Sequence, residues 1–576
     1  MLTAIELGLV LVSVALAFGS SHNQPRWLSA AETAFRGFAQ KRALSVFVVG
    51  LLALLARVAV LPLLPVPEPH ITDEFSHLLL ADTLMHLRLA NPVHPMWIHF
   101  ETFQVIMHPS YASMYPPAQG LFLALGRLLS GNAFAGVCLS VAVLCAAICW
   151  MLQGWLPPEW ALLGGLLAVA RLAVFSYWAN NYGGGAVAAA GGALLLGGLP
   201  RVLRSQRPRD ALLMGLGLAL MANSRPYEGF ILSLPVALVL LVWMLRKRGP
   251  ELRRSALRVA LPLALVLAVS ALGTGYYFWR VTGSPLQMPY QVNRGTYAVA
   301  PYFVWQSAKP LPAYNHEEMR YFYGERELGF YQSSRSLAGY VQLSFFKILR
   351  FWLFYLGPAF TLPLICALAL MPYGFSWSRM SREQRFLLAA TAILIAGFAV
   401  EVFFYPHYAA PMTSIVYVWV LLAIRSLSGW TWRGRPAGRV LAWAVPLVCL
   451  SMLVVRAAAG PLDISLGSEW LATPYNARPL QTDRARVEAE LRAMPGNHLV
   501  LVRVGPHPES DSDWVYNDAD IDSAKIVWAR DMGEKNQELL DYYKTRQVWL
   551  MDTDQDVGQN VGKLRPYLPA ITARSF

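Results

Sequence analysis

The chain has few charged residues and few cysteines, and it contains no glycosylation sequon. Charged residues make up only 14% of its 576 residues, whereas 56% are hydrophobic. With a mean hydropathy of +0.39, this composition excludes an ordinary soluble enzyme and is typical of an integral membrane protein. No disulfide framework is predicted, because all five cysteines lie in apolar stretches: Cys138, Cys145, Cys149, Cys366 and Cys449.

None of the 13 asparagines stands in an Asn-x-Ser/Thr sequence. This absence disfavours the lumen of the endoplasmic reticulum and favours a bacterial inner membrane. The segment Met1–Gly19 is apolar but lacks a basic beginning. We therefore interpret it as a first membrane helix rather than a cleaved signal peptide.

The positive charge of the chain is distributed unevenly. The whole chain carries +13, but the residues after Gly460 hold 18 acidic and 13 basic side chains, a net charge of −5. The basic residues before Gly460 gather in short loops, as expected of loops on the cytoplasmic side, so nucleic acid is not a predicted partner. These loops are residues 26–42, 201–209, 246–258, 379–385 and 425–439.

Placing the basic loops in the cytoplasm fixes a topology. Residues 66–131, 279–342 and 460–576 then lie outside, and an odd number of crossings must separate residue 116 from Arg201. Residues 117–129 are therefore expected to form an interfacial helix instead of a span. We predict about 12 spans: residues 3–19, 43–65, 132–152, 159–176, 183–200, 211–223, 228–245, 259–278, 343–371, 386–404, 409–426 and 440–458.

The tail has a pattern of its own. The β-branched runs at residues 499–504 and 547–551 predict strands, and residues 482–494 and 534–545 predict helices. The expected fold is therefore a mainly α polytopic bundle over residues 1–459, with interfacial helices in its first large outer loop. A small exocytoplasmic α/β domain over residues 460–576 follows.

Two adjacent acids follow a long apolar helix in the first outer loop. The helix, Leu44–Leu64, is ended by prolines, and Asp73 and Glu74 come shortly afterwards. Ionisable groups at a membrane edge are costly, and they usually have a function. The alternative is structural, with Asp73 as an N-cap and Glu74 favoured by the helix dipole.

An amphipathic helix is predicted over residues 73–90. Its apolar stripe also carries Asp82, and a carboxylate on such a stripe needs a partner or a chemical task. The apolar members of the stripe are Phe75, Leu78, Leu79, Met85 and Leu89.

Six of the 11 histidines lie in the same loop. His70 and His77 are candidate ligands for a divalent metal, together with carboxylates. However, Asp73-Glu74-x-x-His77 lacks the first histidine of a zinc-protease motif. The alternative is interfacial packing of the loop, and no cofactor is required by this reading.

Three short motifs together resemble the GT-C superfamily of membrane glycosyltransferases. They are Thr72-Asp73-Glu74, Ala81-Asp82 and Tyr115-Pro116-Pro117-Ala118-Gln119-Gly120. The nearest resemblance is to the bacterial relatives of the protein O-mannosyltransferases and to the aminoarabinose transferases. It extends over about residues 43–300 in arrangement but only over the loop in motif. The helix before Leu44 departs from the family pattern, and the tail matches no known module.

The resemblance implies that a polyprenyl-phosphate sugar is the donor and that the anomeric centre is inverted. It implies that Asp73 is the base. Such a reaction needs one base near the acceptor nucleophile, and Glu74 would orient the acceptor or share the proton. The acceptor is a hydroxyl or amine on an unknown glycan, lipid or protein, and membrane lipid surrounds the enzyme.

The leaving phosphate needs positive charge in a dry place. Arg225 lies in a short outward turn, with an ion pair to Glu228 as the alternative reading. His407 occupies a similar turn. Lys347 and Arg350 are further candidates, although plain anchoring at the headgroup layer explains them better.

Further residues are expected to contact the sugar. In the outer turn Tyr177–Gly185, Asn181 and Tyr182 offer polar contacts, and the glycines permit a close approach of the backbone. Asp82, Tyr115 and Glu228 complete the predicted set. A ligase or polymerase of lipid-linked glycans, or a transporter of lipid-linked sugars, remains an alternative function.

Overall fold

The computed structural model describes residues 1–19, 26–370, 377–464, 466, 471–504, 514–553 and 563–567. The chain divides into two compact units, each assembled from three separate segments. The membrane unit comprises Met1–Val66, Phe134–Gly273 and Ser334–Pro479. The loop unit comprises Pro67–Ala133, Thr274–Ser333 and Leu480–Phe576.

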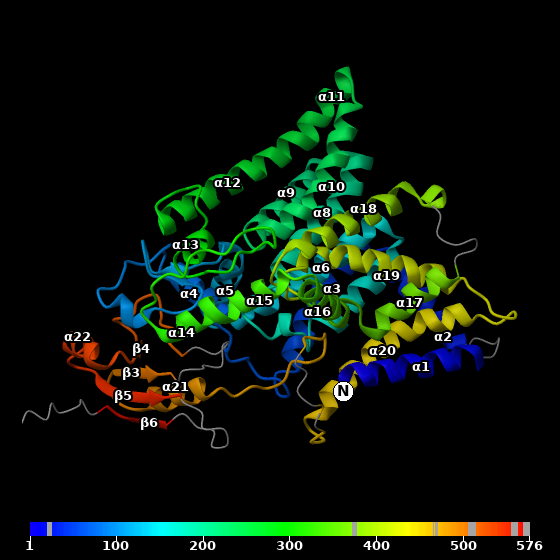
Figure 1. The fold of residues 1–576 in the computed structure, drawn as a ribbon. Helices are drawn as coiled ribbons and strands as arrows, with labels where there is room; N and C mark the ends of the chain where they lie inside the picture. Colours follow the sequence, from blue (N-terminus) through cyan, green and yellow to red (C-terminus); the bar gives the residue numbers. More distant parts are fainter. Residues whose placement is uncertain are drawn as a thin grey trace, which may run out of the picture. The chain divides into compact units, whose positions relative to one another are not determined.

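The membrane unit is helical, and Figure 1 shows its first helix, α1, alongside one of its last, α20. Short 3₁₀ or π-helical turns interrupt it at Tyr177–Ala179, Ala256–Ala260, Trp352–Leu356, Trp377–Arg379 and Ala410–Met412. Its helices are α1 (Leu2–Gly19), α2 (Arg26–Ala39), α3 (Arg42–Ala59), α6 (Phe134–Trp155), α7 (Pro158–Leu172), α8 (Ala186–Ser205), α9 (Pro208–Ala222), α10 (Pro226–Leu245), α11 (Gly249–Ser255), α16 (Leu337–Phe351), α17 (Gly357–Ala369), α18 (Arg382–Val400), α19 (Thr413–Ser428) and α20 (Ala437–Ala459), with α12 (Leu261–Thr282) reaching across the boundary between the units.

Helices lie at all of the predicted spans, and the protein is a multi-pass membrane protein. Among the described residues, ten helical stretches are long and apolar enough to cross a membrane. The other two, α7 and α9, have 15 residues each, which at about 1.5 Å per residue is shorter than a hydrocarbon core of about 30 Å. Twelve crossings therefore stay a prediction. The expected loop at residues 26–42 contains the helix α2.

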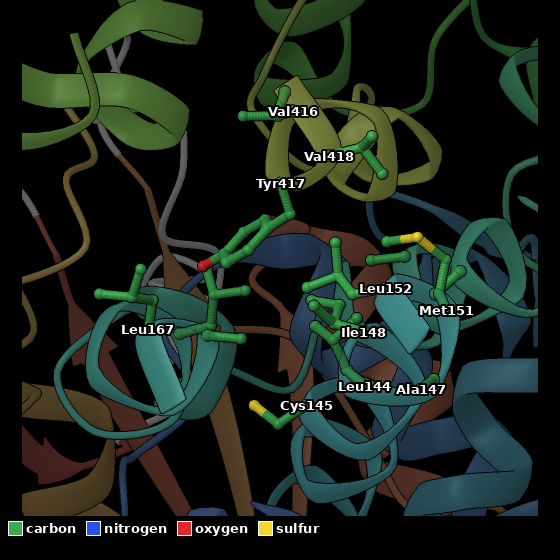
Figure 2. Packing of buried hydrophobic residues seen from close by; sticks show 14 of the residues in the cluster. Leu144, Cys145, Ala147, Ile148, Met151, Leu152, Leu167, Val416, Tyr417 and Val418 are labelled. Atoms are coloured by element: carbon green, nitrogen blue, oxygen red, sulfur yellow. The ribbon is translucent and has the colours of Figure 1, made fainter. Parts of the chain in front are cut away.

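The core of the membrane unit lies where α6, α7 and α19 meet. Figure 2 shows Tyr417 reaching from α19 toward the side chains of α6 and α7. Small residues allow this approach, because a Cβ on Gly165 of α7 would lie 2.8 Å from the Cβ of Cys149. Close packing of small residues is the usual way in which membrane helices associate.

The loop unit combines short helices with two small sheets. Its first segment holds α4 (Thr72–Met85), a turn at Trp97–Phe100, the antiparallel pair β1 (Val105–Ile106) and β2 (Ala112–Ser113), and α5 (Pro117–Ser130). Its second segment holds α13 (Pro289–Thr296), α14 (Glu317–Met319), a π-helical turn at Arg320–Arg326, and α15 (Glu327–Ser334).

The third segment is the predicted α/β tail. It contains α21 (Asp483–Ala493), β3 (His498–Arg503), β4 (Ile526–Arg530), a turn at Gly533–Lys535, α22 (Asn536–Tyr542), β5 (Gln547–Asp552) and β6 (Lys563–Pro566). The sheet order is β4-β3-β5-β6, with β3 parallel to both neighbours and β6 antiparallel to β5. The α/β character is confirmed, and β4 and β6 are strands that the sequence analysis missed.

The predicted helix at residues 73–90 was wrong beyond Met85. The helix α4 ends there, and Leu87 adopts a positive φ of 55°, so Leu89 does not continue the stripe. The predicted amphipathic pattern is also wrong, because α4 is buried on most of its sides. The helix at residues 117–129 is present as α5, while its interfacial position stays a prediction.

Candidate functional site

The start of α4 is organised by Glu74. The N-cap residue is Ile71, which is extended with φ −104° and ψ 143° after the proline-rich approach. Glu74 Oε2 accepts hydrogen bonds from the backbone N–H groups of His70, at 2.9 Å, and Ile71, at 3.0 Å. The reading of Asp73 as the N-cap was therefore wrong. Glu74, which is fully buried, satisfies the helix start instead.

Asp73 is half-buried in the first turn of α4, and the hydroxyl of Tyr115 donates a hydrogen bond to its carboxylate. Tyr115 is itself held firmly. Its carbonyl accepts a hydrogen bond from the Tyr277 hydroxyl at 3.2 Å, and its ring stacks on His77 with centroids 4.3 Å apart. Two residues predicted from separate motifs are thus brought together, and the first turn of a helix favours a negative charge there.

A half-buried ion pair lies within electrostatic reach of Asp73. Arg294 Nη1 donates to both carboxylate oxygens of Glu327, at 2.9 and 2.8 Å. Burial raises the pKa of Glu327, Arg294 opposes that rise, and the negative charge of Asp73 adds to it. No local pattern in the sequence predicts this pair, because the two residues are 33 positions apart.

Asp82 has protein partners at both carboxylate oxygens. Oδ1 lies 2.5 Å from Arg127 Nη1, and Oδ2 accepts the backbone N–H of Ala519 at 2.8 Å. The residue is only 8% exposed. This arrangement explains a carboxylate on a buried helix as a structural contact, and it leaves little surface for the predicted contact with sugar.

The histidine candidates lie around the same turn. His70 Nδ1 is 3.3 Å from Glu74 Oε2, while His77 packs on Tyr115. Within the part of the chain that the structure describes, no three or more His, Cys, Asp or Glu side chains are grouped to hold a metal ion. A divalent metal ion held by His70 and His77 therefore stays a prediction.

The membrane unit contains a second group of predicted residues at the start of α10. Arg225 Nη1 lies 3.8 Å from Glu228 Oε1, and its guanidinium lies 4.1 Å from the centroid of the Tyr408 ring. The ion pair named as the alternative reading is thus present. The Arg225 side chain nevertheless keeps 23% of its surface exposed, whereas that of Glu228 keeps 6%.

His407 joins Arg225 in this group, which we call the arginine–histidine cluster: Arg225, His407, Tyr408 and Tyr177. His407 Nδ1 lies 3.2 Å from the Tyr177 hydroxyl, and its ring meets that of Tyr408 edge-on at 5.0 Å. The cluster combines cationic or protonatable groups with phenol rings, and such groups can bind an anion in a partly dry setting.

Lys347 and Arg350 are one turn apart on α16 and bind backbone carbonyls. Lys347 Nζ donates to the carbonyl oxygens of Phe398, at 3.2 Å, and Glu401. Arg350 Nη1 donates to Phe404 O at 2.8 Å. These contacts fix the end of α18 and the chain that leads to His407. Both the phosphate contact and the anchoring of these two side chains stay predictions.

The glycine-rich turn Tyr177–Gly185 is packed against its own aromatic residue. Gly185 has a φ of +116°, and a Cβ there would lie 2.5 Å from Trp178 Nε1. The close approach predicted for the glycines is therefore made by the buried indole of Trp178. Asn181 Oδ1 accepts the Gly183 N–H at 2.5 Å, and Tyr182 is 5% exposed.

No model of a known protein family matches the chain, and no curated protein matches it. Among solved structures, it is similar to the oligosaccharyltransferase AglB of Archaeoglobus fulgidus in complex with an inhibitory peptide and a dolichol-phosphate. The TM-score is 0.46 and the identity 11%, over 89% of this chain and 69% of that one. A second structure of the Archaeoglobus fulgidus enzyme is tethered with an acceptor peptide. Its TM-score is 0.45 and its identity 12%, over 81% of this chain and 62% of that one.

The chain is also similar to ArnT from Cupriavidus metallidurans in the apo state, with a TM-score of 0.44 and 13% identity. The match covers 91% of this chain and 93% of that one. Each of these similarities is one of fold.

Proposed function

We propose that the protein transfers a sugar from a polyprenyl-phosphate-linked donor to a hydroxyl or amine acceptor, with inversion at the anomeric carbon. The observation that carries the proposal is the carboxylate of Asp73, half-buried in the first turn of α4 and oriented by the Tyr115 hydroxyl. A positioned carboxylate of this kind suits a general base. Glu74 is bound to the backbone, and we assign it the positioning of Asp73.

The proposed step is a single displacement. Asp73 takes the proton of the acceptor O–H or N–H group while that oxygen or nitrogen attacks the anomeric carbon. The bond from the anomeric carbon to the phosphate oxygen breaks, and the polyprenyl phosphate leaves with the electron pair. One carboxylate is sufficient, because an inverting route needs no second carboxylate as a nucleophile.

We assign the leaving phosphate to Arg225 and His407. Arg225 keeps exposed surface beside the Tyr408 ring, and a guanidinium can bind two phosphate oxygens at once. Lys347 and Arg350 support this assignment indirectly, because they fix the chain that carries His407. We include no metal ion in the step, and activity after dialysis against a chelator tests that choice.

Transfer to water provides an assay that needs no knowledge of the natural acceptor. Purified full-length protein is incubated with polyprenyl-phosphate-linked radiolabelled mannose, glucose or aminoarabinose, and the free sugar and its anomeric configuration are measured. Asp73→Asn is expected to lower the rate by at least about 100-fold without lowering the melting temperature. Glu534→Gln, at an exposed acid of the loop unit, is the matched control. Full activity of Asp73→Asn would remove the base from the proposal.

We also propose that the loop unit faces the outside of a bacterial inner membrane. Leu286 is 91% exposed in the loop unit, whereas Arg253 is exposed in the basic segment between α10 and α12. A membrane-impermeant maleimide applied to intact spheroplasts is expected to label Leu286→Cys and not Arg253→Cys. Labelling only at position 253 would reverse the orientation.

A further inference from the structure

We propose that Tyr516 and Arg484 of the tail position Asp73 for the transfer by holding α4. The inference rests on the proposed function, since it concerns the base of that reaction. No motif in the tail indicates a role, and yet its described residues contact α4 near both ends.

Phe75, two residues after Asp73, is the first point of contact. Its ring stacks on that of Tyr516 with centroids 4.5 Å apart and an angle of 8° between the planes. The guanidinium of Arg484 lies 4.7 Å from the centroid of the same ring. Arg484 is fixed in turn, because its Nε donates to Trp514 O at 3.1 Å and its Nη2 donates to Tyr516 O at 3.0 Å.

The second point of contact is Asp82, which accepts the backbone N–H of Ala519 at 2.8 Å. Phe75 and Asp82 are seven residues apart, which places them on the same face of a helix about 10 Å from each other. One short segment, residues 516–519, therefore contacts α4 near its start and near its end. Two contacts along one face restrain both the tilt of a helix and its rotation.

The chain that leads into α4 is held by the same tail. Glu68 Oε2 accepts hydrogen bonds from the Thr482 N–H, at 2.9 Å, and from the Thr482 hydroxyl, at 3.2 Å. Thr482 is also the N-cap of α21. The extended approach to Ile71 and the first turn of α4 are consequently both fixed by tail residues.

Tyr516 is a positioning residue and not a catalytic one. Residues i and i+2 of a helix point about 200° apart, so the side chain of Asp73 does not share the face of Phe75 that Tyr516 covers. The effect of Tyr516 on the reaction passes through the helix. A displacement of about 1 Å of a catalytic group costs on the order of 100-fold in rate, so loss of the stack is expected to lower kcat.

The test compares Tyr516→Leu with Tyr516→Phe in the full-length chain. Tyr516→Phe keeps the stacked ring and loses the hydrogen bond from the Tyr516 hydroxyl to Phe103 O, which measures 3.2 Å. We expect Tyr516→Leu to lower kcat about 10- to 100-fold with an unchanged KM for the donor, and Tyr516→Phe to restore kcat to within about 3-fold. Amide hydrogen exchange in α4 should accelerate in the leucine variant alone.

The hydrogen-exchange measurement separates this inference from the proposed function. A wild-type protein that transfers no sugar from any donor would defeat the proposed function, while α4 exchange would still show whether Tyr516 holds the helix. An active protein in which Tyr516→Leu keeps both the wild-type kcat and the wild-type exchange would overturn the inference. If Tyr516→Leu fails to fold, Arg484→Gln takes its place, because it removes the guanidinium that lies over the Phe75 ring. The expected result is again a lower kcat with an unchanged KM for the donor.

Discussion

Arg171 and Glu6 form an ion pair inside the membrane unit, with 3.2 Å between Arg171 Nη1 and Glu6 Oε1. The two side chains are 1% and 5% exposed. Arg171 Nη2 also donates to Leu356 O at 3.1 Å, and its guanidinium lies 4.3 Å from the centroid of the Phe360 ring. The first helix, α1, is therefore tied to α7 and to the start of α17 by charge as well as by packing.

Removal of one partner of this pair is expected to destabilise the membrane unit strongly. Arg171→Met leaves Glu6 buried without its cation, and such a loss costs about 3–5 kcal/mol. The double variant Glu6→Gln/Arg171→Met removes both charges and should recover most of that loss. Thermal unfolding of the purified variants in detergent measures both effects. A double variant that is no more stable than Arg171→Met would contradict the pairing.

Glu74 and Asp73 are expected to respond differently to neutralisation. Glu74→Gln keeps a carbonyl oxygen that can accept from the backbone of His70 and Ile71, so stability and transfer should both stay within a few-fold of wild type. Glu74→Ala removes the acceptor and should lower stability by about 1 kcal/mol. The rate of transfer to water and the melting temperature are measured for both variants beside Asp73→Asn. If Glu74→Gln is as inactive as Asp73→Asn, Glu74 takes part in the chemistry.

Variants of Arg225 and Arg350 are expected to have different effects, because we assign donor binding to Arg225 and support of the neighbouring chain to Arg350. Arg225→Gln removes a charge-assisted contact to phosphate, worth about 1.5–3 kcal/mol, so the KM for the donor should rise about 10- to 100-fold. Arg350→Gln releases Phe404 O and is expected to lower the melting temperature with a smaller change in that KM. Steady-state kinetics over a series of donor concentrations distinguishes the two. Equal donor KM values for Arg225→Gln and wild type would return Arg225 to its ion pair with Glu228.

The loop unit is expected to lose stability in mild acid because of His99. The side chain is 4% exposed, and burial lowers the pKa of His99 below its ordinary value. The folded protein then binds fewer protons than the unfolded chain, so the contribution of His99 is complete above a pH of about 6.5 and is lost as the pH falls below it.

Thermal unfolding at pH 7.5 and 5.5 measures this loss. The difference in melting temperature between the two pH values should be smaller in His99→Gln than in the wild type. The buried His498 acts in the same direction, since burial also lowers its pKa. The variant His108→Gln, at an exposed histidine of the loop unit, is the matched control and should keep the wild-type difference. A wild-type protein that is equally stable at both pH values would contradict the prediction.

The apolar helices could be predicted from the sequence because each carries its own signal. Length and hydropathy located α3, α6 and α10, and β-branched runs located β3 and β5. The strand β4 was missed because it is only five residues long and ends in Arg530, a charged residue that the fold buries. The end of α4 was missed because the turn at Leu87 depends on a positive φ that leucine rarely adopts.

The candidate site was predictable to the extent that its residues stand in motifs. Asp73 and Tyr115 were both proposed from the loop sequence, and the structure places a hydrogen bond between them. The roles of Glu74 and Asp82 could not be derived from the sequence. Glu74 binds backbone N–H groups whose position depends on the preceding prolines, and Asp82 binds Ala519, which is 437 positions away. Contacts over such separations leave no periodic pattern in a single sequence.

The three-segment construction of the loop unit has a consequence for biosynthesis. The helix α4 is made early, but its partner Ala519 follows 437 residues later, after the helices of the membrane unit. A nascent chain folds in the order in which it is made, so α4 waits for the tail without the Tyr516 ring against Phe75 and without the Ala519 N–H at Asp82 Oδ2. The base of the proposed reaction thus acquires its final geometry only near the end of synthesis, and a chain released prematurely would be inactive as well as prone to aggregation.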